Sequence, residues 1–185
     1  RKIFSGAIAG DVLKGDHGAW FRAMFAPSVT AGLLAATDLA GYRGHQVYIR
    51  NAQHVPPPRE AVREMMPVLF ELLRDERSAA VRAVLGHFMF VFIHPYMDGN
   101  GRLGRFIMNT MLASGGFPWT VLRLEDRDRY MAALNAASGQ GDIKPFASFV
   151  AQSLDAARDA QADPLHDDGA LEANIEEDDP QRPRG

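Results

Sequence analysis

The sequence contains no cysteine among its 185 residues, which excludes a disulfide scaffold and a zinc site built from thiolates. Its longest apolar run, VLGHFMFVFI, is too short to cross a bilayer. No phosphate-binding loop of the G-x-x-x-x-G-K-[S/T] type is present. Because no signal peptide is recognisable at the start, we expect a cytoplasmic protein without membrane contacts. The first residue is not methionine, so the chain could be a piece of a longer protein.

The sequence also lacks a strong positive charge. Its net charge of −3 is unevenly distributed along the chain. Residues 163–185 carry eight acids and two arginines, a net charge of −6, which leaves +3 on residues 1–162. A duplex-binding protein usually has a more basic face, so nucleic acid is not an expected partner. The acidic segment is polar and punctuated by proline, so we predict a body over residues 1–162 and a disordered tail over 163–185.

Helical patterns dominate the body and predict an all-α bundle. Pro27 should end the first helix, and Pro67 should kink or split another. Ser78 is a plausible N-cap, Pro145 lies in a first turn where proline is tolerated, and the apolar helix after Ser78 should be the buried central one. Helices are expected over residues 18–26, 59–76, 78–94, 101–114, 125–138 and 142–161, and residues 28–44 read as a short helix running into glycine-rich turns.

Only residues 45–58 read as a strand region. Val47 and Ile49 alternate with polar or amphipathic neighbours such as Tyr48, and a turn follows before three consecutive prolines. We therefore predict a small, exposed β-hairpin joined to the helical bundle.

The densest cluster of chemical groups is HPYMDGNGRLGR, residues 94–105, between the apolar helix and the next one. Pro95 should place His94 at a helix C-terminus. Gly99 and Gly101 favour a tight turn, and the first N–H groups of the following helix have no intrahelical partners. Such a helix start binds anions, especially phosphate.

Charged side chains around this turn suit a magnesium–nucleotide. Arg102 and Arg105 can share one helix face and bind phosphate oxygens. Asp98 could hold Mg²⁺ together with phosphates and water. His94 has an ordinary pKa suited to removing a proton from a hydroxyl. The residues alone therefore predict a site that activates a nucleophile against phosphorus. The alternative without a catalytic role is a helix–helix turn with solvated arginines.

The segment resembles the signature of the Fic family, H-P-F-x-[D/E]-G-N-G-R-x-x-R. Tyr96 replaces the usual phenylalanine, which packs beneath the loop, and its hydroxyl would need a partner. The resemblance extends over residues 38–155 and implies the Fic-fold helical bundle with a β-hairpin flap. Eight positions match: His94, Pro95, Asp98, Gly99, Asn100, Gly101, Arg102 and Arg105.

The resemblance implies a reaction, the transfer of AMP from ATP to a Ser, Thr or Tyr hydroxyl of a target protein. His94 would be the general base and Asp98 the Mg²⁺ ligand. Gly99, Asn100 and Gly101 would form the anion hole, and Arg102 and Arg105 would contact the β- and γ-phosphates.

The Doc kinases of this superfamily carry lysine where this chain has Gly101, so Gly101 favours adenylylation over phosphorylation. The flap, Val47, Tyr48 and Ile49, would pair with an extended segment of the target. Tyr130, Asn135 and Ser138 are tentative adenosine contacts, with ordinary helix packing as the alternative.

Many relatives are inhibited by a helix bearing [S/T]-x-x-x-E-[G/N], whose glutamate pairs with the second motif arginine, here Arg105. This pattern does not occur in the sequence. The inhibitory element would then come from a missing N-terminal segment or from a separate antitoxin-like protein, unless regulation takes another form. A homodimer is a further candidate assembly.

Several alternatives stay open from sequence. The same fold could use another phosphate donor, remove AMP, act as the toxin of a toxin–antitoxin pair, or only sense nucleotide. His87 reads as a satisfied core histidine, and His45 and His54 read as surface residues near the hairpin.

Overall fold

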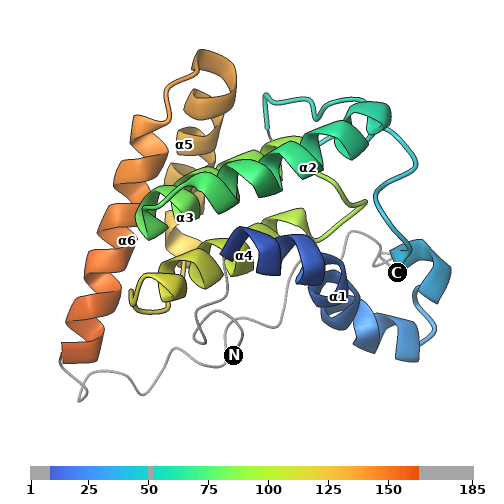
Figure 1. Ribbon diagram of the computed structural model, residues 1–185, viewed down its shortest axis with the longest axis horizontal. Helices are drawn as coiled ribbons and strands as arrows, with labels where there is room; N and C mark the ends of the chain where they lie inside the picture. Colours follow the sequence, from blue (N-terminus) through green and yellow to red (C-terminus); the bar gives the residue numbers. More distant parts are fainter. Residues whose placement is uncertain (1–8, 50–51, 163–185) are drawn as a thin grey trace, which may run out of the picture.

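A computed structural model describes residues 9–49 and 52–162. Within those ranges every regular element is helical and no strand is assigned, so the all-α prediction is confirmed. The succession along the chain is easiest to follow in Figure 1. The elements are α1 (Ala9–Thr30), the 3₁₀ helix η1 (Ala36–Leu39), α2 (Arg59–Asp75), α3 (Ala79–Ile93), α4 (Asn100–Ser114), the 3₁₀ helix η2 (Leu124–Asp126), α5 (Arg127–Gln140) and α6 (Lys144–Ala162).

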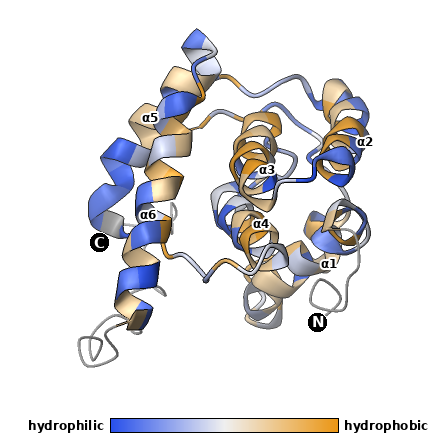
Figure 2. Ribbon diagram, turned by 60° about the vertical axis from the view of Figure 1, so that its left-hand side comes forward, coloured by the Kyte–Doolittle hydropathy of each residue, from blue (hydrophilic) through white to orange (hydrophobic). Residues whose placement is uncertain are grey.

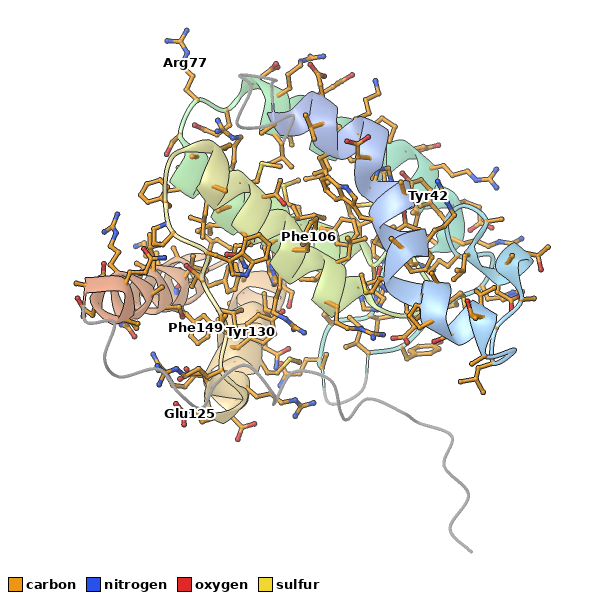
Figure 3. All side chains as sticks on the ribbon, turned by 90° about the horizontal axis from the view of Figure 1, so that it is seen from below. Tyr42, Arg77, Phe106, Glu125, Tyr130 and Phe149 are labelled. Carbon is orange, nitrogen blue, oxygen red and sulfur yellow. The ribbon has the colours of Figure 1, made fainter. Side chains whose placement is uncertain are left out.

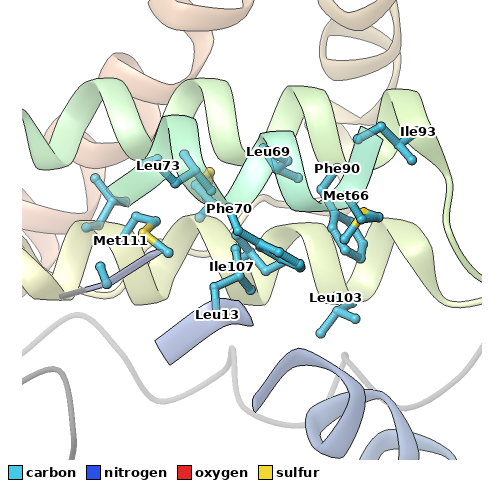
Figure 4. Packing of buried hydrophobic residues seen from close by; sticks show 14 of the residues in the cluster. Leu13, Met66, Leu69, Phe70, Leu73, Phe90, Ile93, Leu103, Ile107 and Met111 are labelled. Carbon is cyan, nitrogen blue, oxygen red and sulfur yellow. The ribbon is translucent and has the colours of Figure 1, made fainter. Parts of the chain in front are cut away.

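Helices α3 and α4 pack along their lengths at the centre of the molecule, with α1 and α2 on one side and α5 and α6 on the other (Figures 1 and 2). The helices approach closely because Gly104 has no side chain: a Cβ there would lie 2.8 Å from Cγ1 of Val91. Fully buried side chains from α1, α2, α3 and α4 fill the core between them, as Figure 4 shows. They include Leu13, Met66, Leu69, Phe90, Leu103, Ile107 and Met111.

The prediction that Pro27 ends the first helix is wrong. Helix α1 continues to Thr30, and the N–H of Ala31 still donates to the carbonyl of Pro27 at 2.9 Å. Proline removes only its own N–H, which leaves the carbonyl of Ala23 without that helical bond. Both residues are exposed, so water can replace the lost donor.

Helix α2 is continuous through Pro67, so the predicted split does not occur. Pro67 is exposed, as is Arg63 one turn before it, where the hydrogen bond is lost. The opposite face buries Val62, Met66 and Leu69 at helical spacing. Burial of that face stabilises the helix despite the proline.

Three further expectations about helix ends are confirmed. Ser78 is the N-cap of α3, and its hydroxyl accepts the N–H of Val81 at 3.4 Å. Gly115 ends α4, and Gly116 follows with φ +77°. Pro145 lies in the first turn of α6.

Helix α3 is central but not buried all round. Its inner face is covered by α4, while Phe88 and Phe92 are only half-buried and line a shallow apolar groove against Met65 and Val68 of α2. None of the helices in the described ranges is both long and apolar enough to span a membrane.

Candidate active site

His94 lies where α3 ends, as predicted. Its N–H still donates to the carbonyl of Phe90 at 3.0 Å, but its backbone is left-handed, with φ 52° and ψ 60°. Of the non-glycine residues described, it alone has positive φ. Pro95 cannot continue the helix, so the chain turns away at once.

The half-buried His94 imidazole has a defined orientation. Nδ1 lies 3.2 Å from the carbonyl of Val91, which assigns the proton to Nδ1 and leaves a lone pair on Nε2. Burial is the largest influence on this ring and lowers the His94 pKa below its usual value. The Val91 carbonyl opposes that effect, and the positive charge of Arg43 adds to it. A neutral imidazole with a free Nε2 can accept a proton.

Asn100 holds the loop after His94 in shape. Its side chain is 1% exposed and clamps the backbone of Tyr96 from both sides. The Oδ1 atom accepts the N–H of Tyr96 at 2.9 Å, and Nδ2 donates to the carbonyl of Tyr96 at 2.8 Å. Asn100 can therefore offer an anion its backbone N–H, while its amide is engaged in the loop.

Tyr96 is buried beneath this loop, where the motif's usual phenylalanine was expected to pack. Its ring stacks on Phe21 with 3.7 Å between centroids and 8° between planes. Burial is the main cause that raises the Tyr96 pKa far above its usual value. The phenol therefore stays neutral.

Gly99 is the N-cap of α4 and has φ +73°, a conformation that residues with side chains rarely adopt. A Cβ at this position would also lie 2.8 Å from the ring of Phe25. The first intrahelical bond runs from the N–H of Leu103 to the carbonyl of Gly99 at 2.9 Å. The N–H groups of residues 100–102 thus lie in the first turn, where a helix binds anions, whereas the N–H of Gly99 donates to Oδ1 of Asp98 at 2.5 Å.

Asp98 and the two motif arginines surround this helix start. Oδ2 of Asp98 lies 3.3 Å from a guanidinium nitrogen of Arg102, and both side chains are about half exposed. The Arg102 guanidinium also lies over the ring of Phe25, 4.9 Å from its centroid. An exposed pair of this kind contributes under about 1 kcal/mol, so either partner can be redirected to a ligand.

Arg105 lies one turn further along α4, next to Tyr130 of α5. Burial raises the Tyr130 pKa to about 12, an effect that the neighbouring Arg105 guanidinium partly offsets. The Tyr130 hydroxyl is 2.8 Å from Nε2 of His87. Its ring packs against Phe149 of α6, and Figure 3 shows both rings on the side of the molecule formed by α5 and α6.

The structure thus connects Tyr130 to the motif through Arg105. His87 is fully buried, as expected of a core histidine, but only its Nε2 is satisfied, by Tyr130, since its buried Nδ1 has no hydrogen-bond partner among the described residues. Of the other tentative adenosine contacts, the hydroxyl of Ser138 donates to the carbonyl of Leu134 at 2.8 Å, an ordinary helical contact. Oδ1 of Asn135 accepts the N–H of Gln53 at 3.4 Å, which joins α5 to the segment before α2.

The predicted hairpin falls on residues 45–58, of which 50 and 51 lie outside the described ranges. The described part forms no paired strands, so the hairpin is not seen there. Tyr48 is 78% exposed, while Val47 and Ile49 are half-buried, so the predicted alternation of side chains is present.

Sequence reasoning missed how firmly this segment is tied to α3. His54, expected on the surface, is half-buried, and its Nε2 lies 2.8 Å from the carbonyl of Phe92. Arg43, not singled out in the sequence, is 4% exposed and donates through Nε to the carbonyl of His94 at 2.8 Å. An arginine inside GYRG gives no local signal that it will be buried. His45 is exposed, as expected.

Comparison with known proteins identifies the family. A sequence profile described as the Fic/DOC family matches residues 20–112, which is half of the chain. The chain belongs to the Fic/DOC family. The match ends just inside the C-terminal part of α4 and so includes the segment from His94 to Arg105.

Two curated relatives of this Fic chain are named protein adenylyltransferases. The Fic protein of Nematostella vectensis is 38% identical over 123 residues, covering 64% of this chain and 28% of the relative. The fic-1 protein of Caenorhabditis briggsae is 36% identical over 118 residues, covering 62% of this chain and 23% of the relative. The chain thus spans about a quarter of the length of these relatives.

Solved structures confirm the Fic fold. Fic-1 (residues 134–508) from C. elegans superimposes with a TM-score of 0.66 at 29% identity, covering 80% of this chain and 42% of that one. A Fic family protein from Desulfovibrio desulfuricans G20 gives a TM-score of 0.57 at 28% identity, covering 83% of this chain and 50% of that one.

Proposed function

We propose that this protein transfers AMP from ATP to a Ser, Thr or Tyr hydroxyl of a target protein. The observation that carries the proposal is the position of a neutral, oriented His94 between the end of α3 and the anion-binding start of α4. The names of the curated relatives support the same reaction.

In this reaction His94 would take the proton of the target hydroxyl on Nε2. The attacking oxygen forms a bond to the α-phosphorus, and the bond from phosphorus to the β-phosphate oxygen breaks, releasing pyrophosphate. The N–H groups of Gly99, Asn100 and Gly101 would stabilise the charge on the phosphate oxygens. Arg102 would bind the β-phosphate and Arg105 the γ-phosphate.

Mg²⁺ fits the residues present. The described residues contain no cluster of three or more His, Asp or Glu side chains able to enclose a metal ion. Asp98, however, is an exposed carboxylate beside the proposed phosphate site. Mg²⁺ is commonly held by one or two carboxylates together with substrate phosphates, so Asp98 suffices. When bound, the ion would neutralise phosphate charge.

The exposed segment Val47, Tyr48 and Ile49 would serve as the flap. We propose that an extended stretch of the target pairs with its backbone, which would then adopt the strand conformation of the predicted hairpin. Two contacts at the end of α3 support this. Arg43, before the flap, donates to the carbonyl of His94, and His54, after the flap, lies within hydrogen-bond distance of the carbonyl of Phe92. Together they keep the flap near the proposed catalytic base.

The proposed function also includes how the activity is regulated and where the protein is located. An inhibitory carboxylate reaching Arg105 would come from a further segment or from a separate antitoxin-like protein. A cytoplasmic location agrees with the lack of cysteine in the sequence. Assembly into a homodimer stays a prediction.

The test is incubation of the protein with cell lysate and ATP labelled at the α position, with a parallel γ-labelled reaction. His94→Ala is the matched variant and should retain MgATP binding while losing transfer. Covalent α-label that disappears in His94→Ala, without γ-label, would support adenylylation.

Other results would favour the alternatives. Label only from the γ position would mean phosphorylation and would overturn the proposed role of Gly101. MgATP binding without His94-dependent label from either position would favour a nucleotide sensor. Loss of α-label from a target that had already been modified would indicate removal of AMP.

A further inference from the structure

We propose that Arg43 is a positioning residue whose buried guanidinium joins the backbone of His94 to the chain on both sides of the flap, at His45 and Pro57. The effect of Arg43 on catalysis rests on the proposed function. Its effect on the positions of His94 and the flap can be tested without any transfer activity.

The contacts of Arg43 reach three separate segments. Nε donates to the carbonyl of His94 at 2.8 Å, at the end of α3. One terminal nitrogen donates to the carbonyl of His45 at 2.9 Å, shortly before the flap. The other donates to the carbonyl of Pro57, shortly before α2. The fixed fork of a guanidinium can bond three acceptors in different directions, which an ammonium group at one point cannot reproduce.

The backbone of Arg43 adds a fourth contact, because its N–H donates to the carbonyl of Pro95 at 2.8 Å. Two successive carbonyls, those of His94 and Pro95, are therefore bound by one residue. The direction of the His94 carbonyl is set by ψ of His94, the angle that completes its left-handed conformation. A non-glycine residue persists in that region only when its surroundings hold it there.

Burial ties the position of this guanidinium to its partners. Arg43 is 4% exposed, and the three acceptors of its guanidinium are backbone carbonyls rather than a carboxylate. A buried charge is costly unless its donors are satisfied, so its position depends on all three carbonyls being in place. Movement of the flap would therefore disturb the hydrogen bond to His94.

The neighbouring residue extends the same connection to α1. The hydroxyl of Tyr42 lies 3.0 Å from Nε2 of His17, whose Nδ1 lies 2.9 Å from the carbonyl of Leu13. Figure 3 shows Tyr42 beside α1. The residue before Arg43 is thus anchored to α1, which gives the Arg43 guanidinium a fixed point from which to hold the loop. Its positive charge also helps to keep the His94 pKa low.

The experiment compares Arg43→Met and Arg43→Lys with the unmodified protein. Arg43→Met retains an apolar stem without donors, and Arg43→Lys retains the charge without the fork. Arg82→Met is the matched control, because Arg82 also donates to two carbonyls, those of Glu76 and Arg77, but at the opposite end of α3. Thermal unfolding of all three variants defines the temperature at which each is folded.

Two measurements need no activity. Cleavage by chymotrypsin at Tyr48, which is 78% exposed, should accelerate by about fivefold or more in both Arg43 variants, because the flap opens more easily. The NMR titration of the His94 ring, assigned by comparison with His94→Ala, should move to higher pH in Arg43→Met. Arg82→Met should leave both measurements unchanged.

The third measurement is α-label transfer in lysate together with MgATP binding. Arg43→Met and Arg43→Lys should lose about 100-fold in transfer, as expected for a displaced catalytic group, while MgATP affinity stays within about threefold. The phosphate-binding turn is held separately by Asn100, so nucleotide binding should survive.

The outcomes separate the two proposals. If the unmodified protein transfers no AMP but the flap and the His94 titration respond as stated, the proposed function fails and the positioning by Arg43 stands. Unchanged flap cleavage and an unchanged His94 titration in Arg43→Met would overturn the positioning. So would an equal loss of MgATP binding and transfer, or full transfer by Arg43→Lys.

Discussion

At the scale of single residues, the backbone around the motif is shaped by side chains that are themselves buried. Asn100 fixes Tyr96, and Arg43 binds the carbonyl of His94. The exposed members, Asp98 and Arg102, are paired only loosely with each other. The site therefore combines a rigid backbone with an exposed guanidinium, that of Arg102, and an exposed carboxylate, that of Asp98, whose Oδ1 also accepts the N–H of Gly99.

The pH dependence of transfer follows from His94. Burial lowers the pKa of this imidazole below its usual value, so the neutral, proton-accepting form should persist to lower pH than in free histidine. We expect the transfer rate to be level at neutral pH and to fall as the pH drops through the lowered pKa. A rate profile measured at saturating MgATP checks this. A midpoint at or above pH 6.5, the ordinary pKa of a histidine side chain, would contradict the neutral-base assignment.

The two hydrogen bonds from the Asn100 side chain to the Tyr96 backbone should contribute measurably to the free energy of unfolding. Asn100→Ala removes both partners of the Tyr96 backbone, and buried groups left unpaired cost roughly 1–3 kcal/mol each. We expect about 2–4 kcal/mol lower free energy of unfolding, measured by urea denaturation, together with weaker MgATP binding. Thr110→Ala is the control, since its exposed hydroxyl only donates to a carbonyl within α4. Equal effects of the two substitutions would argue against this contribution.

At the scale of elements, the site depends on the close approach of α3 and α4. The loop between them is short, so the distance between the two helices decides where His94 and the start of α4 lie. That distance is permitted by Gly104, which faces Val91 and the ring of His87.

Gly104→Ala should therefore destabilise the protein although alanine favours helices. The new Cβ would lie 2.8 Å from Val91 Cγ1, and overpacking of this kind costs about 1–3 kcal/mol. Gly15→Ala in α1, where no heavy atom lies within 4 Å of the new Cβ, should instead be neutral or stabilise by up to about 1 kcal/mol. Urea denaturation measures both. The double variant Gly104→Ala/Val91→Ala should recover part of the loss if the clash is the cause.

At the scale of the whole molecule, His87 links global stability to pH. Its ring is fully buried against Tyr130 and Phe146, and burial lowers its pKa from 6.5 to about 4. As the pH falls, the unfolded chain thus takes up this proton before the folded protein does. The free energy of unfolding is unaffected by His87 above pH 6.5 and decreases as the pH falls from 6.5 to about 4.

This loss should amount to roughly 3 kcal/mol by linkage. The free energy of unfolding, measured at several pH values between about 7 and 4, should fall less steeply in His87→Phe than in the unmodified protein. The comparison of slopes cancels any constant effect of the substitution. Parallel curves would show that His87 does not carry this dependence.

Much of this protein could be predicted from local sequence. The helices after residue 59, the N-cap at Ser78, the helix end at Gly115 and the place of His94 at the end of α3 follow from neighbouring residues. The N-terminal part was predicted less well, because α1 begins at Ala9 rather than at residue 18 and residues 28–44 contain only the end of α1 and the 3₁₀ helix η1. The spacing of eight motif residues is by itself enough to indicate the family. These features depend on hydrogen bonds and backbone angles within a few positions, which the sequence specifies directly.

Tertiary structure decided the rest. Local rules predicted a break at Pro27 and Pro67, but packing of the opposite helix face kept both helices continuous. No local pattern indicates that Arg43 is buried or that its guanidinium binds a carbonyl 51 positions away. Burial and the bonds of a guanidinium depend on which segments meet in space, so they become visible only once the helices and the segment before α2 are packed together.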